Sequence, residues 1–167
     1  MESYEVTQAL MSVGTVYHVR KPRTEDTLYT VRGELMTSTP KFHLVEGDQG
    51  KPIADLTANF IKTKYEIRSH PGQATEGTSK VLGSLLFPAV AFKKTLTLTV
   101  GDDEYKADGG VFKGVFQCKK GDGSVVLEIV KELSFRDTFL VKTTDVLPLE
   151  VGLLSAVAIH SRFYEMI

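Results

Sequence analysis

The sequence predicts a single mainly β domain, residues 1–167, in which a closed barrel of about twelve strands wraps around a central, apolar C-terminal helix. Short alternating segments separated by turn residues occupy most of the chain at spacings of roughly ten residues, which is typical of all-β sandwiches and barrels. One uninterrupted apolar run, residues 149–160, follows them near the end of the chain. The 167 residues are enough for one domain with a substantial core.

The strands are predicted where apolar and polar residues alternate between polar or glycine-rich connections. Residues 63–68 alternate strictly, with Tyr65 and Ile67 on one face and charged side chains on the other. The glycines of residues 120–123 predict a hairpin turn, and residues 69–78 form the longest predicted loop. In chain order, the predicted strands cover residues 16–20, 27–33, 41–46, 52–58, 63–68, 80–87, 95–100, 104–107, 113–119, 124–131 and 137–143.

The apolar run at residues 149–160 predicts a helix that is enclosed on every side. Between Glu150 and His160 the only polar side chain is Ser155, whereas a surface helix has a charged face. The run is shorter than the roughly 20 residues of a bilayer span, so we interpret it as a core helix, capped by Asp145 or Thr144. A barrel of more than about eight strands leaves a lumen, and this helix would fill it.

The charge, the cysteine content and the N-terminus narrow the class of protein. There are 20 basic and 21 acidic residues, a net charge of -1, so we expect no nucleic-acid partner. The single cysteine, Cys118, excludes an intramolecular disulfide and fits a reducing compartment. The first residues lack the basic and apolar regions of a signal peptide. We therefore expect a cytoplasmic protein without a transmembrane segment, peripheral at a membrane surface if it binds lipid.

The segment Lys131–Val141 resembles a pattern of the LURP-one-related family, which belongs to the tubby C-terminal-like and phospholipid scramblase-like superfamily. That pattern is a basic residue, an aromatic residue, and then Asp-Thr-aromatic-x-Val, followed by the apolar helix. The chain departs from it at Phe135, at Phe139 and at His160, where tryptophan, tyrosine and an acidic residue are usual. The resemblance implies a twelve-stranded barrel around a central helix. It implies no agreed activity, although tubby proteins bind phosphoinositides through basic residues.

Few residues have the spacing of a catalytic or metal site. The four histidines lie far apart along the chain and none has a ligand partner at metal-binding spacing, so we expect neither a metal nor a cofactor. His70, in the longest predicted loop, is the one candidate acid or base. Cys118 lies in a predicted strand beside two lysines, and we interpret it as an inert strand cysteine rather than a nucleophile.

Basic side chains give a candidate binding surface. Strand alternation predicts Lys62, Lys64 and Arg68 on one outer face, with Glu66 between them. The pairs at residues 93–94 and 119–120 would add to it if they lie nearby. Such a surface attracts anionic lipid headgroups by about 1 kcal/mol per charge. If binding depends instead on apolar insertion, the C-terminal tail, residues 163–167, is the predicted insertion point.

These observations favour a non-catalytic binding or adaptor module, for anionic lipid headgroups or for a protein partner. The alternative is a small enzyme with a pocket at a barrel end, which shapes a reactive small-molecule substrate as a cyclase or isomerase of secondary metabolism does. A lipocalin-like carrier fits less well, because its helix packs outside the barrel and needs a polar face.

Overall fold

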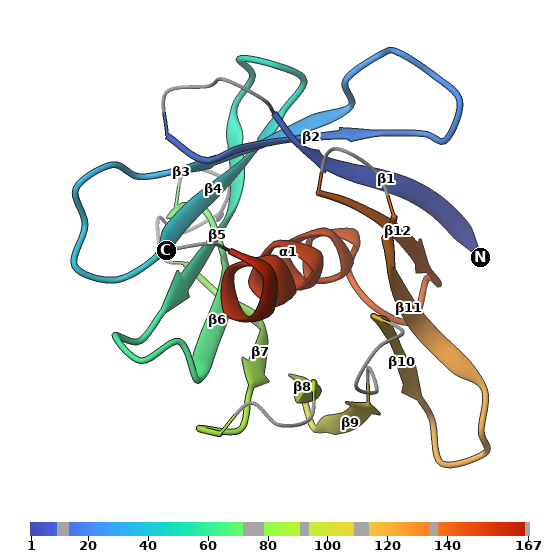
Figure 1. Ribbon diagram of the computed structural model, residues 1–167. Coiled ribbons are helices and arrows are strands. Elements are labelled where there is room, and N and C mark those ends of the chain that lie inside the picture. Colours follow the sequence, from blue (N-terminus) through green and yellow to red (C-terminus); the bar gives the residue numbers. More distant parts are fainter. Residues whose placement is uncertain (10–13, 72–78, 91–93, 109–113, 134–136, 166–167) are drawn as a thin grey trace.

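A computed structural model describes residues 1–9, 14–71, 79–90, 94–108, 114–133 and 137–165. They form one twelve-stranded antiparallel sheet that curls into a nearly closed barrel (Figure 1). The strands are β1 (Glu2–Gln8), β2 (Val16–Arg20), β3 (Tyr29–Gly33), β4 (Lys41–Glu46), β5 (Pro52–Ala58), β6 (Lys64–Ser69), β7 (Val81–Leu86), β8 (Thr95–Val100), β9 (Asp103–Asp108), β10 (Val115–Lys119), β11 (Val125–Glu132) and β12 (Thr138–Thr143).

Almost every strand pairs with its neighbours along the chain. The exception joins the two ends of the chain, because β1 pairs with both β2 and β12. This places β9 and β10 at the two edges of the sheet, where they lie side by side in Figure 1. The predicted mainly β barrel is confirmed, and every predicted strand is present. The strands predicted at residues 16–20, 41–46, 52–58 and 95–100 have the predicted bounds, and the others have shifted ends. The strand that the alternation did not locate is β1.

Helix α1 (Leu149–Ile159) lies in the middle of the ring of strands (Figure 1). Every residue from Val151 to Ile159 is buried, as the uniformly apolar run predicts. Gly152 meets the wall closely, because a Cβ placed there would lie 3.4 Å from Leu127 and from the Thr143 hydroxyl. The barrel is therefore filled by its own helix.

The predicted helix cap is wrong. Pro148 is the N-cap residue and no side chain caps the helix. The Thr144 hydroxyl donates instead to the carbonyl of Val126 in the barrel wall, at 3.0 Å. The Pro148 carbonyl accepts the first hydrogen bond, from the Val151 amide at 3.0 Å, and a rigid proline needs no side-chain oxygen to begin the turn.

After α1 the chain continues as a short π-helix, η2 (His160–Tyr164), which closes one end of the barrel. Phe163 stacks on Phe116 with ring centroids 6.0 Å apart and packs edge-on against Phe87. The prediction that residues 163–167 form an exposed insertion tail is therefore wrong for Phe163 and Tyr164, which pack against the core. Residues 166–167, like Phe135 and most of the predicted loop 69–78, lie outside the described residues.

At one end of the barrel, the loops that connect the strands contact the C-terminal part of the helix. Lys62 donates to the carbonyl of Ser161, and Arg162 donates to the carbonyl of Pro88. Asp137 bonds to His160 on another side. We call the described loop residues at this end, 34–40, 59–63, 87–90, 94, 133 and 137, the C-terminal rim.

The buried helix gives a direct test of the fold. We expect Val157→Asp to abolish folding, because Val157 is fully buried and an unpaired charge there should offset most of a domain's stability of about 5–15 kcal/mol. Val146→Asp is the control, since Val146 is 43% exposed just before the helix. Urea unfolding followed by circular dichroism measures both variants. A soluble Val157→Asp protein that unfolds cooperatively would refute the central position of α1.

Candidate functional site

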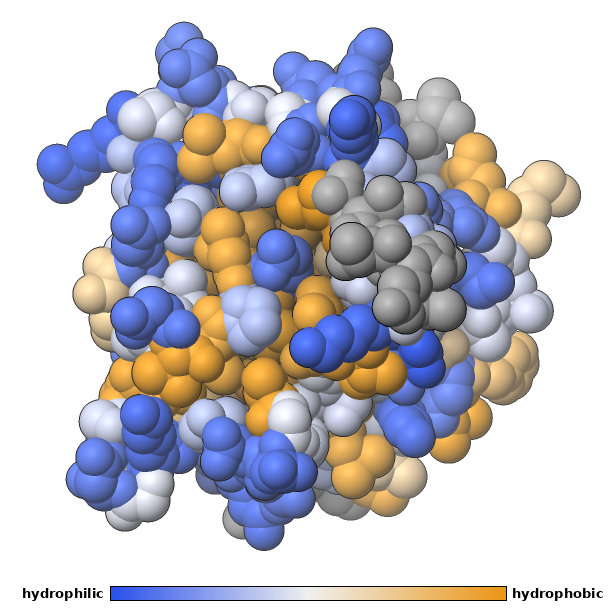
Figure 2. Space-filling model, turned by 180° about the vertical axis from the view of Figure 1, so that it is seen from behind, coloured by the Kyte–Doolittle hydropathy of each residue, from blue (hydrophilic) through white to orange (hydrophobic). Residues whose placement is uncertain are grey.

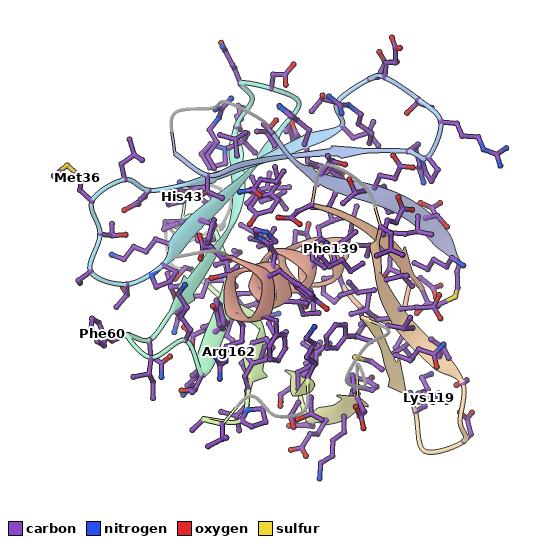
Figure 3. All side chains as sticks on the ribbon, in the orientation of Figure 1. Met36, His43, Phe60, Lys119, Phe139 and Arg162 are labelled. Atoms are coloured by element: carbon purple, nitrogen blue, oxygen red, sulfur yellow. The ribbon has the colours of Figure 1, made fainter. Side chains whose placement is uncertain are left out.

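The C-terminal rim carries large apolar side chains that point into solvent. The loop between β3 and β4 exposes Leu35 and Met36, and the loop between β5 and β6 exposes Phe60 and Ile61. Val90 and Leu133 are exposed on two further rim loops. Met36 and Phe60 point away from the barrel in Figure 3. The rim therefore presents several separate apolar tips around one end of the barrel.

The loop between β5 and β6 holds its tip by its own hydrogen bonds. The Asn59 side-chain oxygen accepts from the amides of Thr63 and Lys64, at 2.8 and 3.0 Å. Lys62 has φ +56°, a left-handed conformation that is rare for a residue with a side chain. These features fix a tight turn with Phe60, which is 78% exposed, at its outer side. The tip residue is held out in solvent rather than folded onto the sheet.

Met36 has the same unusual conformation in the neighbouring loop, with φ +58°. The two loops border one shallow hollow of about 260 Å³, whose lining includes residues 37–41, Phe60, Lys62 and Glu165. The Lys62 ammonium lies 2.9 Å from the Glu165 carboxylate. Lys41, which begins β4, is exposed and lines this hollow. Lys64, which begins β6, is also exposed and lines a separate hollow of about 230 Å³ together with Asn59 and Glu66.

The three predicted basic residues do not form one row. Lys62 precedes β6 and turns toward η2, so strand alternation does not apply to it. Lys64 is the first residue of β6 and is exposed next to the rim. Arg68 lies near the far end of β6 and pairs with Glu66. Lys119, labelled in Figure 3, ends β10 away from the rim, and Lys93 lies outside the described residues.

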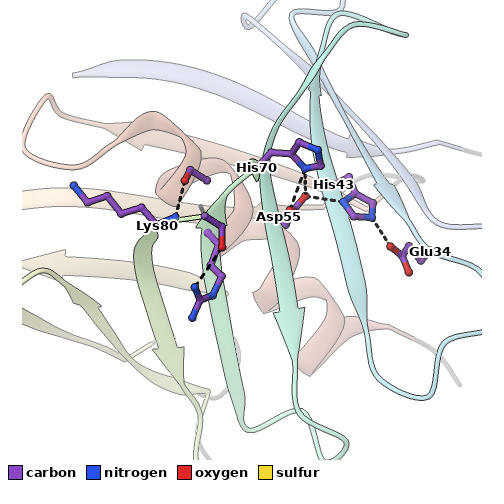
Figure 4. A network of polar contacts seen from close by, with 8 residues as sticks. Glu34, His43, Asp55, His70 and Lys80 are labelled. Atoms are coloured by element: carbon purple, nitrogen blue, oxygen red, sulfur yellow. Dashed lines mark hydrogen bonds and ion pairs between the residues drawn. The ribbon is translucent and has the colours of Figure 1, made fainter. Parts of the chain in front are cut away.

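His70, the predicted acid or base, belongs to a polar chain on the outer face of β4, β5 and β6 (Figure 4). Its Nδ1 lies 3.2 Å from the Asp55 carboxylate, and the same carboxylate lies 2.6 Å from Nδ1 of His43. Nε2 of His43 lies 2.6 Å from Glu34. Burial lowers the pKa of His43, but its hydrogen bonds to Asp55 and Glu34 outweigh burial, so the pKa is raised.

A second chain of polar side chains is buried where the helix ends. The Tyr17 hydroxyl lies 2.5 Å from Nδ1 of His160, and Nε2 of His160 lies 2.8 Å from Asp137. Burial raises the pKa of Tyr17 well above its ordinary value. Tyr17 and His160 are at most 1% exposed, so no substrate reaches them. This chain has the order of groups of a catalytic triad, but Tyr17 and His160 belong to the buried core, while the Asp137 side chain is partly exposed.

The end of the barrel opposite the C-terminal rim carries a hollow whose border is lined by polar and charged residues. Figure 2 shows an apolar area framed by hydrophilic side chains on the face seen from behind. A hollow of about 580 Å³ borders the start of α1, with Leu147 and Leu149 among its apolar lining and Glu2 and Asp145 among its charged lining. No histidine lines this hollow or the one of about 460 Å³ beside β8.

Cys118 is buried in β10. Burial raises the pKa of its thiol to about 12, so the thiolate that a nucleophile requires is absent near neutral pH. The interpretation of Cys118 as an inert strand cysteine agrees with this environment.

Comparison with known proteins identifies the fold and no more. No protein-family model and no curated protein matches the chain. A LURP-one-related protein of Arabidopsis thaliana, known from its X-ray structure, is similar with a TM-score of 0.58 at 9% sequence identity. The match covers 95% of this chain and 88% of that one. The similarity supports the tubby-like barrel that the segment before the helix implies. No helix among the described residues is long and apolar enough to cross a membrane.

The bond between Asp137 and His160 predicts an acid-dependent loss of stability. Burial raises the pKa of Asp137, but its hydrogen bonds to His160 and Lys131 outweigh burial, so the pKa lies below its ordinary value of 3.8. A depressed carboxyl pKa stabilises the fold above the unfolded value, and this contribution is lost as the pH falls through the folded value.

We expect Asp137→Asn to unfold about 1–2 kcal/mol more easily at neutral pH, a modest figure because the side chain is partly exposed. The difference from the unsubstituted protein should shrink toward pH 3, where the carboxyl of the latter begins to protonate. Urea unfolding at both pH values measures this. A destabilisation of the same size at both would assign Asp137 a role independent of its charge.

Proposed function

We propose that the protein is a non-catalytic binding module that docks on anionic lipid surfaces through the C-terminal rim. The observation that carries this proposal is the gathering of exposed apolar side chains on several loops at one end of the barrel, beside Lys41 and Lys64. The similarity to a LURP-one-related structure is compatible with it but supports the fold alone.

The spacing of the apolar tips favours a lipid surface over a protein partner. Protein interfaces usually bury one continuous apolar centre, whereas the rim presents single side chains on separate loops. Each tip that enters the bilayer boundary would contribute about 1.5–3 kcal/mol, and each nearby lysine about 1 kcal/mol at an anionic surface. Phe60 and Ile61 on one loop and Leu35 and Met36 on the next supply the apolar part.

The basic part of the proposed surface is smaller than the sequence predicted. Lys64 has no ion pair within the described part of the chain and lies next to the rim, so it is the best candidate for headgroup contact. Lys62 would have to break its ion pair with Glu165 before it could contact a headgroup. Arg68 would contribute only through long-range attraction, because Glu66 neutralises it locally. Apolar insertion therefore carries more of the proposal than charge does.

Vesicle co-sedimentation tests the proposal with matched variants. We expect binding to vesicles that contain phosphatidylserine and weaker binding to phosphatidylcholine alone. Phe60→Asp should lower binding by at least about tenfold, the equivalent of one lost apolar insertion. Val81→Asp is the control, since Val81 is 45% exposed at the end of β7 away from the rim.

Charge reversal separates attraction from insertion. Lys64→Glu should weaken binding more than Lys119→Glu, and added salt should weaken binding because charges are screened over about 8 Å at physiological ionic strength. All variants should melt at the temperature of the unsubstituted protein. Absence of binding to anionic vesicles at low salt would exclude lipid docking and leave a protein partner as the target of the rim.

A second candidate function rests on the hollow of about 580 Å³ beside the start of α1. Its apolar floor and charged border fit a small amphiphilic molecule, as the alternative of a substrate-shaping enzyme requires. His70 does not line this hollow, so the acid or base of such an enzyme would have to come from Glu2, Tyr4 or Asp145. Saturable binding of a fluorescent apolar dye that is reduced by Asp145→Trp would favour this candidate.

A further inference from the structure

Three polar side chains, from β4, from β5 and from the residue directly after β6, meet on the outer face of the barrel. His43 lies in the middle of β4 between the buried Phe42 and Leu44, so strand alternation points it outward. Asp55 is its direct partner across the β4–β5 pair. His70 directly follows β6, and its amide donates to the carbonyl of Ile53 in β5 at 3.1 Å. The sheet itself therefore sets the distances between these groups.

The potential ligand atoms are close enough to share one ion. One nitrogen of each histidine and one oxygen of Asp55 all lie within 4.8 Å of one another. In a tetrahedral site with metal–ligand distances of about 2.0–2.2 Å, neighbouring ligand atoms are about 3.4 Å apart. The His70–Asp55 distance of 3.2 Å already fits, and the His43–Asp55 distance of 2.6 Å must open by only about 0.8 Å.

Glu34 completes the arrangement from the other side of His43. Its carboxylate lies 2.6 Å from Nε2 of His43, so it accepts a hydrogen bond from the Nε2–H group and orients the ring. Nδ1 of His43 lies 2.6 Å from the Asp55 carboxylate and donates to it, so a metal ion would displace this proton and take its place between Nδ1 and the carboxylate. Metal-binding histidines almost always donate their second nitrogen to a carboxylate or carbonyl in this way. Among the described residues, this group of three is the one whose ligand atoms meet so closely.

We propose that His43, Asp55 and His70 bind a divalent transition-metal ion of the Zn²⁺ type, with Glu34 as the positioning residue behind His43. Two imidazoles and one carboxylate suit Zn²⁺, Co²⁺ or Fe²⁺, whereas Ca²⁺ and Mg²⁺ take oxygen ligands. The three side chains are between 20% and 33% exposed, so water has access to the remaining coordination position. The three proposed ligands lie outside the C-terminal rim, whereas Glu34 belongs to it and directly precedes the exposed Leu35 and Met36.

Titration of the tag-free full chain, first stripped with a chelator, tests the site. We expect Zn²⁺ to bind with a stoichiometry of one and a Kd of about 10 µM or tighter by isothermal titration calorimetry, compatible with three protein ligands. His43→Ala, His70→Ala and Asp55→Ala should each weaken binding at least tenfold. His18→Ala is the matched control, because His18 lies in β2 and is not part of the group.

Glu34→Gln separates orientation from coordination. It should weaken Zn²⁺ binding by about 10–100-fold, the usual effect of removing such a supporting group, while the protein keeps a stoichiometry of one. Co²⁺ gives a second readout in the unsubstituted protein, since visible absorption bands of four- or five-coordinate Co²⁺ should appear on addition and disappear when Zn²⁺ is added.

The outcomes decide the proposal in either direction. Loss of Zn²⁺ binding in the three ligand variants, with unchanged thermal melting in the presence of chelator, would establish the site. Absence of saturable binding by the unsubstituted chain, or equal affinity in His43→Ala and His18→Ala, would overturn it. If a ligand variant does not fold, the Co²⁺ spectrum of the unsubstituted protein still decides, because a spectrum of fully hydrated octahedral Co²⁺ would exclude imidazole ligation.

Discussion

Enclosure of a helix without a polar face is the constraint on which the rest of this structure depends. Helix α1 buries every residue from Val151 to Ile159, and a helix of this kind is stable in water only if protein surrounds it completely. Twelve strands provide a wall long enough to do so. The pairing of β1 with β12 joins the two ends of the chain in one sheet, and the edge strands β9 and β10 lie side by side to complete the nearly closed wall. The helix also occupies the space in which a carrier protein of similar shape would hold its ligand.

This filled interior places the protein's chemistry on its outside and at its two ends. The polar groups that remain inside, such as Tyr17 and His160, bond to each other and stabilise the helix end instead of meeting a substrate. The two ends differ in character. One carries apolar tips on its loops, and the other carries charged turns around an apolar hollow. The outer face of β4 to β6 adds a compact polar group whose distances are set by strand pairing.

The sequence predicted the barrel and its central helix because both depend on simple periodicities. Alternation along residues such as 63–68 defines a strand, and an apolar run without charges defines a buried helix, whatever the surrounding residues are. The strand β1 was not located, since its first and last residues are polar on both faces. The helix cap was predicted wrongly because Thr144 bonds to a carbonyl of the wall, a contact between elements that local pattern does not contain.

The group of His43, Asp55 and His70 could not be predicted from the sequence, because it too depends on contacts between different strands. His43 and His70 are separated by 27 positions of numbering, and only the register of β4 on β5 and of β5 on β6 brings them to one carboxylate. A spacing rule for metal ligands looks for neighbours along one element and misses partners across strands. The exposed tips at Met36 and Phe60 left no periodic signal either, because loop residues follow turn geometry. The row of Lys62, Lys64 and Arg68 depended on extending β6 too far toward the preceding turn.

Native-state hydrogen exchange at the amides of α1 tests the enclosure most directly. If the helix is the core around which the barrel closes, its central amides, from Leu153 to Ile159, can exchange only when the whole domain unfolds. The free energy of opening measured at these amides should then equal the free energy of unfolding obtained from urea denaturation. Exchange of these amides at a markedly lower free energy than global unfolding, while the strands stay protected, would contradict the account, because the helix would then leave the barrel without destroying it.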